Sequence, residues 1–102
     1  MSTYKIKPQF RNESHFTDSI RKAARVFGWR TYHTRFSKGS EAGFPDLVLT
    51  KRNRLIFAEL KTQKGKLTGP QREWLKSLEE SGQDVFVWRP SDWDTILELL
   101  QK

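Results

Sequence analysis

The chain has 102 residues, contains no cysteine and carries a formal net charge of +7. Its length predicts one domain with a modest core, and the lack of cysteine excludes disulfide bonds and thiolate metal sites. No apolar run approaches the roughly 20 residues that cross a membrane, and the first residues lack the apolar centre of a signal peptide. We therefore expect a soluble, intracellular protein.

The charge balance favours a polyanionic partner. The chain has 19 lysines and arginines against 12 aspartates and glutamates. Basic side chains that neutralise phosphates release the counterions condensed on a nucleic acid, which favours binding. A basic surface also serves solubility, so charge alone leaves both interpretations open. An anionic membrane surface is the weaker alternative, because no strongly basic amphipathic helix stands out.

The N-terminal part predicts an arm followed by a helix. Residues 1–12 are polar, show no clear period and are expected to form a flexible arm, which leaves 13–102 as a single domain. Apolar residues recur at helical spacing from Ser14 to Phe27. Gly28 then supplies a stop, because glycine accepts the left-handed conformation that follows many helices.

Three strands are predicted next. Trp29–Phe36 is rich in aromatic residues and threonine and predicts a strand, followed by a flexible loop to Gly43. Asp46–Thr50 and Leu55–Lys61 read as a β-hairpin with the polar turn KRNR between them.

The last part of the chain predicts helix, strand and helix. Thr68 can cap a helix, Pro70 fits its first turn, and Gln71 can close a capping box. Val85–Arg89 alternates like a strand, and Ser91 opens a last helix. The order α-β-β-β-α-β-α predicts an α/β fold with a mixed sheet flanked by helices. The link between the last two strands resembles the crossover that joins parallel strands.

The predicted hairpin places charged residues in segments that otherwise resemble core. Because strand side chains alternate between faces, Glu59 and Lys61 share one face. The hairpin also brings Asp46 near the end of the second strand. Magnesium prefers hard oxygen ligands, which two carboxylates and the backbone carbonyl of Leu60 could provide. A lysine beside the ion could orient a water and offset charge on a phosphate. The alternative is an ordinary cross-strand ion pair, worth about 0–1 kcal/mol when exposed.

Four segments together resemble one known family. GFPDL, AELKTQKGKLT, PQREWL and SGQDVFVWRPSDW are similar to the VRR-NUC (virus-type replication-repair nuclease) family of the PD-(D/E)xK nuclease superfamily. The resemblance runs from about Glu13 to Trp93 and implies a restriction-endonuclease-like fold. It implies Asp46 and Glu59 as metal ligands and Lys61 as the catalytic lysine. It further implies two more site residues, Gln71 on the following helix and an acid on the N-terminal helix, for which Glu13 is the best match.

The resemblance also implies an activity. We expect a Mg²⁺-dependent endonuclease acting on DNA, with Mn²⁺ as a substitute, in replication, recombination or repair. Small members of the family resemble homodimers that cut Holliday junctions, so branched DNA and a homodimer are expected, in the cytoplasm of a bacterial or virus-infected cell. The alternatives are a non-catalytic nucleic-acid-binding module, and a restriction or RNA-processing nuclease.

Further cationic and polar residues are candidates for contacts with DNA, because proteins hold phosphates with side chains of these kinds. Two aromatic residues, Trp29 and Tyr32, could stack on exposed bases, although packing in a core or a dimer is the expectation for both. The candidate phosphate contacts lie after the catalytic strand and around the first loop: Lys64, Lys66, Arg35, Ser37, Lys38 and His33.

Overall fold

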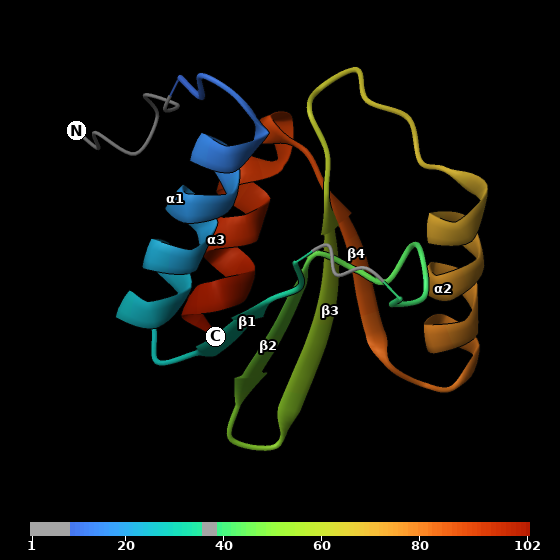
Figure 1. Ribbon diagram of the computed structural model, residues 1–102. Coiled ribbons are helices and arrows are strands. Elements are labelled where there is room, and N and C mark those ends of the chain that lie inside the picture. Colours follow the sequence, from blue (N-terminus) through green and yellow to red (C-terminus); the bar gives the residue numbers. More distant parts are fainter. Residues whose placement is uncertain (1–8, 36–38) are drawn as a thin grey trace.

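The computed structural model describes residues 9–35 and 39–102 (Figure 1). The sequence-based expectations for residues 1–8, Ser37 and Lys38 therefore lie outside the described residues. The elements follow the predicted order: α1 (Glu13–Val26), β1 (Arg30–His33), β2 (Leu47–Lys51), β3 (Arg54–Leu60), α2 (Gly69–Glu80), β4 (Asp84–Trp88), the 3₁₀ turn η2 (Pro90–Asp92) and α3 (Trp93–Gln101).

The four strands form one mixed sheet in the order β1-β2-β3-β4. β2 is antiparallel to both of its neighbours, β1 and β3, and Leu47 lies opposite Ala58 in the β2–β3 hairpin. β4 pairs with β3 in parallel, so that Leu60 lies beside Trp88. The predicted crossover between parallel strands is confirmed, because α2 connects β3 to β4.

Local signals in the sequence set the helix ends. The side chain of Asn12 accepts a hydrogen bond from the backbone of His15 and caps α1. Gly28 follows α1 with φ +92°, a conformation that favours glycine. The predicted capping box at the start of α2 is present between Thr68 and Gln71.

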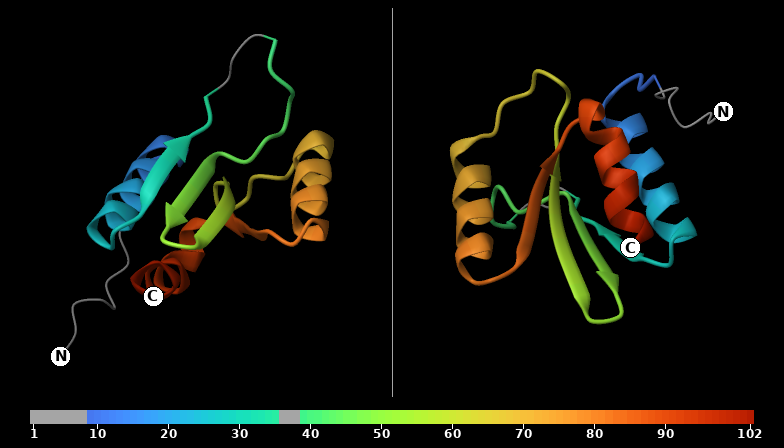
Figure 2. Two further views of the ribbon diagram at one scale, coloured as in Figure 1. Left: turned by 90° about the horizontal axis from the view of Figure 1, so that it is seen from below. Right: turned by 180° about the vertical axis from the view of Figure 1, so that it is seen from behind.

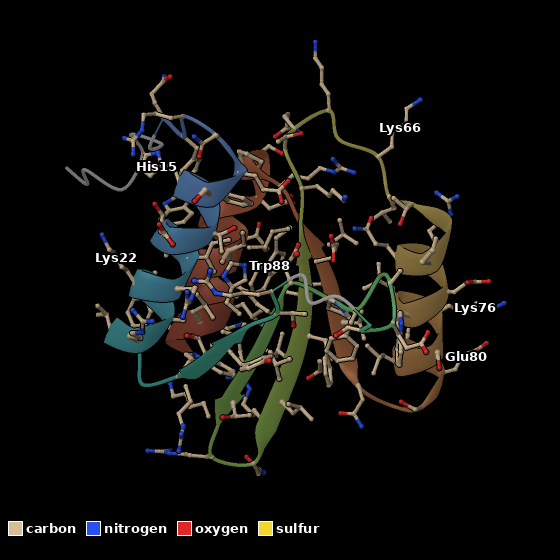
Figure 3. The ribbon with its side chains drawn as sticks, in the orientation of Figure 1. His15, Lys22, Lys66, Lys76, Glu80 and Trp88 are labelled. Carbon is tan, nitrogen blue, oxygen red and sulfur yellow. The ribbon has the colours of Figure 1, made fainter. Side chains whose placement is uncertain are left out.

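The hydrophobic core lies between the sheet and two helices. α1 and α3 lie side by side on one face of the sheet (Figures 1 and 2). Trp88 is 4% exposed and lies in the core between the sheet and these two helices (Figure 3). The indole N–H of Trp29 donates to the carbonyl oxygen of Leu100 at 2.9 Å, which ties the start of β1 to the end of α3. The apolar core consists of Phe16, Ile20, Ala24, Trp29, Leu47, Leu49, Ile56, Ala58, Leu60, Trp88, Ile96 and Leu100.

The opposite face of the sheet is only partly covered. α2 packs against β4 at one edge (Figures 1 and 2). The segment before β2 reaches across the sheet toward α2, where Phe44 contacts Phe57 and Trp74 edge to face. The strands farther from α2 therefore keep side chains exposed on this face. No helix in the described part of the chain is long and apolar enough to cross a membrane.

Two expectations about the first strand need correction. β1 is shorter than the predicted Trp29–Phe36, because Trp29 turns into the core before the strand begins. Packing in a core or a dimer was expected for Tyr32, and the first of these is wrong, because Tyr32 is 64% exposed on β1. Strand alternation explains the difference, since Tyr32 lies on the face that neither α1 nor α3 covers. The strands of the predicted hairpin also begin and end at other residues than expected. Asp46 lies just before β2, and Lys61 lies just after β3.

Candidate active site

The sheet brings three polar residues into one row. The register that pairs Leu47 with Ala58 places Asp46 opposite Glu59. On the other side, the backbone N–H of Thr34 donates to the carbonyl of Asp46 at 2.7 Å. Directly opposed residues in antiparallel strands present their side chains on the same face. Thr34, Asp46 and Glu59 therefore share the face opposite α1 and α3.

Asp46 is fixed by the strand that carries its partner. Its Oδ2 accepts a hydrogen bond from the backbone N–H of Leu60 at 2.9 Å, and Pro45 before it is fully buried. In an antiparallel ladder the N–H and C=O of one residue point to the same side. The carbonyl of Leu60 is therefore expected on the side of Asp46, as a third hard oxygen ligand requires.

Glu59 is a buried carboxyl whose hydrogen bonds are incomplete. The residue is only 2% exposed, and its Oε1 has no hydrogen-bond partner among the described residues. Its Oε2 lies 3.8 Å from Nζ of Lys61. Burial and the neighbouring Asp46 raise the pKa of Glu59 from 4.5 to about 8, with a smaller contribution from Glu13 and an opposing one from Lys61.

These observations fit a divalent cation. A buried oxygen without a partner usually indicates an absent water or ion, and a cation between Asp46 and Glu59 would relieve the repulsion that raises the pKa of Glu59. The described residues contain no cluster of three His, Asp or Glu side chains that could hold a metal. Magnesium fits such a sparse site, because it keeps several waters and binds through one or two carboxylates.

Glu13 and Gln71 approach the site from two helices. Glu13 is exposed in the first turn of α1, within electrostatic range of Glu59. Oε1 of Gln71 accepts a hydrogen bond from the backbone N–H of Thr68, and the same side chain lines a cleft with Asp46. Capping the helix and facing the site are therefore compatible roles for Gln71.

The basic loop after β3 is held by a residue that the sequence analysis missed. Nη1 of Arg89 donates to the carbonyls of Thr62 at 2.7 Å and of Gly65 at 2.6 Å, with a longer contact to Gln63 at 3.4 Å. Gln63 is held in turn by Ser91. The available signal was the position of Arg89 at the end of a strand predicted to run parallel to the one with Glu59.

The loop that Arg89 holds exposes two cationic side chains. Lys64 and Lys66 are both exposed, and Lys66 points outward (Figure 3). The loop follows Lys61 directly, and the backbone N–H of Lys61 donates to the carbonyl of Trp88. The loop that directly follows Lys61 therefore exposes two cations.

The remaining predicted contacts fall on different faces. Arg35 is exposed and lines the cleft that includes Asp46. His33 lies opposite Leu47, a core residue, and so faces α1 and α3 rather than the site. His33 makes no hydrogen bond or ion pair with the described residues.

The sequence matches the model of the VRR-NUC domain over residues 5–92. The chain belongs to the VRR-NUC family. Membership of this family relates the chain to nucleases, and the candidate site described above lies within the matched segment. A comparison with curated proteins finds no match.

Solved structures share the fold of this VRR-NUC domain. A structure described as a VRR-NUC domain is similar with a TM-score of 0.71 and 21% identity, covering 84% of this chain and 94% of the other. A VRR-NUC domain protein is similar with a TM-score of 0.70 and 17% identity, covering 92% and 88%. Hjc of Archaeoglobus fulgidus, a Holliday junction resolvase, is similar with a TM-score of 0.59 and 18% identity, covering 74% and 66%. These likenesses confirm the predicted restriction-endonuclease-like architecture.

Proposed function

We propose that this VRR-NUC domain is a metal-dependent endonuclease that hydrolyses phosphodiester bonds in DNA. The observation that carries the proposal is the buried Oε1 of Glu59, which lacks a partner in the described residues and belongs to a carboxyl opposite Asp46. A buried polar atom without a partner calls for an explanation, and a bound ion is one. The pair with Lys61 involves the other oxygen, at 3.8 Å.

Each side chain has a distinct role in this proposal. Asp46 and Glu59 hold Mg²⁺, which supplies an activated water and polarises the phosphate when bound. Lys61 neutralises charge on the phosphate and orients the water that it contacts. Gln71, which lines the same cleft as Asp46, contacts a water in this proposal, and Glu13 adds negative charge near the ion.

The proposed substrate is DNA, and branched DNA in particular. The net charge of +7 and the exposed Lys64 and Lys66 support a phosphate-rich partner. The fold similarity to a Holliday junction resolvase supports a four-way junction as one substrate. A homodimer would match the two-fold symmetry of such a junction, with one site for each cut strand.

Cleavage of labelled linear, flapped and four-way DNA tests the proposal, with Mg²⁺, with Mn²⁺ and with a chelator. The wild type should cut only when the metal is present. Lys61→Ala should bind DNA but cut it about 10²–10⁴-fold more slowly, as expected for loss of a positioned proton-transfer group. Lys76→Ala is the matched control, because Lys76 is exposed on α2 and points away from the site (Figure 3).

Three outcomes would contradict all or part of the proposal. DNA that is bound but not cut under all these conditions would favour the binding-module alternative. Undiminished cutting by Lys61→Ala would remove this lysine from the mechanism. Cutting of RNA in preference to every DNA would retain the metal site and reject the substrate.

A further inference from the structure

A cleft of about 790 Å³ begins at Asp46 and extends toward the edge of the sheet. One wall is β1 and the residues after it, and the other is the segment before β2 together with the start of α2. The residues that matter for the argument are Tyr32, Thr34, Arg35, Asp46 and Gln71. The cleft therefore joins the candidate metal site to a surface that the reaction itself does not require.

Tyr32 presents an aromatic ring in this cleft. It is 64% exposed, and Val26 is the only other strongly exposed large apolar side chain among the described residues. Tyr32 and Thr34 are two residues apart on one strand, so they share the face of Asp46. A ring that is exposed in a cleft beside the candidate site is available to stack on a base.

Thr34 lies opposite Asp46, to which its backbone N–H donates, and two residues from Tyr32. Its Oγ1 is buried and has no hydrogen-bond partner among the described residues. Positions two apart along a strand are separated by about 7 Å, so Tyr32 and Thr34 follow one another along the cleft. An aromatic face, a hydroxyl and the cation of Arg35 thus line the cleft that contains Asp46.

These groups fit an unpaired nucleotide better than a base pair. Proteins hold single strands by stacking bases on aromatic rings beside cationic groups that follow the backbone. In a duplex the faces of each base are already stacked on their neighbours, so an exposed ring gains contact only when a base leaves the stack. A neutral peptide would leave the cation of Arg35 without an anion.

We propose that Tyr32 and Thr34 form a subsite for one unpaired nucleotide next to the bond that is cut. Tyr32 stacks on the base, and Thr34 donates or accepts a hydrogen bond from the same nucleotide. The substrate class is then DNA with a single-stranded nucleotide at the cleavage position. The position of the cut rests on the proposed function, whereas binding of the nucleotide does not.

Binding of 2-aminopurine DNA tests this subsite. Two probes are compared, one with 2-aminopurine unpaired at a junction and one with it paired inside a duplex, in a Lys61→Ala background that keeps the DNA intact. Tyr32→Ala should weaken binding of the unpaired probe about 5- to 150-fold, the range for loss of one stacked base. It should also abolish the quenching of 2-aminopurine fluorescence and leave the paired probe unaffected.

Three further variants sharpen the result. Tyr32→Phe keeps the stacking ring and should retain both affinity and quenching. Thr34→Val removes the hydroxyl with little change in shape and should weaken only the unpaired probe. Val26→Ala is the matched control, because Val26 is 79% exposed at the end of α1 and does not line the cleft. Thermal unfolding of each variant verifies that it is folded.

The two proposals fail separately. If Tyr32→Ala weakens both probes equally, or weakens neither, the subsite is refuted even when the wild type cuts DNA. If the wild type cuts no DNA with any metal, but 2-aminopurine is quenched only when Tyr32 or Phe is present, the subsite stands and the nuclease proposal falls.

Discussion

Replacing Glu59 with glutamine should remove most of the pH dependence of stability in the metal-free protein. Glu59 is 2% exposed, and its burial beside Asp46 raises the pKa from 4.5 to about 8. The unfolded chain therefore loses this proton at lower pH than the folded chain. Each pH unit between about 4.5 and 8 then favours unfolding, and the penalty is complete above the folded-state pKa.

The size of the effect follows from the same shift. At 1.36 kcal/mol for each pKa unit, the rise from 4.5 to about 8 corresponds to about 5 kcal/mol in total. Roughly 2–3 kcal/mol of this penalty develops between pH 6 and pH 9, because part of it is already present at pH 6 and its growth ends once the folded-state carboxyl ionises near pH 8. Glutamine resembles the protonated acid in shape and remains neutral throughout.

Urea unfolding followed by tryptophan fluorescence measures the difference. In chelator, the wild type should lose stability from pH 6 to pH 9 relative to Glu59→Gln, while the control Glu80→Gln, exposed on α2, follows the wild type. Added Mg²⁺ should restore the wild type at pH 9 and have little effect on Glu59→Gln, because a ligand stabilises the state that binds it. Parallel pH profiles for the wild type and Glu59→Gln would refute the assignment of a raised pKa to Glu59.

Two further predictions concern the segments that frame the site. Arg89→Ala should slow DNA cleavage by about 10²-fold, because three carbonyls of the loop after Lys61 lose their common donor and misplacement of a site by about 1 Å has effects of that order. Arg72→Ala, which removes only a contact to Leu67, should cleave like the wild type, and equal rates for all three proteins would exclude a positioning role for Arg89. Gly43→Ala should lower the free energy of unfolding by about 1–3 kcal/mol, since φ is +93° and a Cβ would lie 2.5 Å from the carbonyl carbon of Pro70. Gly39→Ala is its control, with the same φ and no atom within 4 Å, so urea unfolding that shows equal losses for both variants would contradict a tight contact between the loop and α2.

The arrangement of Asp46, Glu59 and Lys61 was predictable because it depends on local rules. Alternation along a strand places Glu59 and Lys61 on one face, and a short hairpin leaves little freedom in register. The capping box at Thr68 and the stop at Gly28 are likewise set by neighbouring residues.

Features that depend on distant contacts were not predictable in the same way. Trp29 and Tyr32 lie in the same stretch of sequence, which is rich in aromatic residues and threonine. Trp29 is nevertheless buried and donates to Leu100, 71 residues away, whereas Tyr32 is exposed. Arg89 reaches carbonyls 24–27 residues earlier in the chain. The first outcome follows from how α3 packs near the start of β1, and the second follows from the pairing of β3 with β4; neither is specified by a local pattern.

Diffraction from crystals soaked in Mn²⁺, measured at an anomalous wavelength, tests the metal site most directly. An anomalous peak within coordination distance of Oδ of Asp46 and Oε1 of Glu59, lost in Asp46→Asn, is the expected result. A fully soaked crystal with these two carboxyl groups turned apart and no peak between them would contradict the proposed metal site.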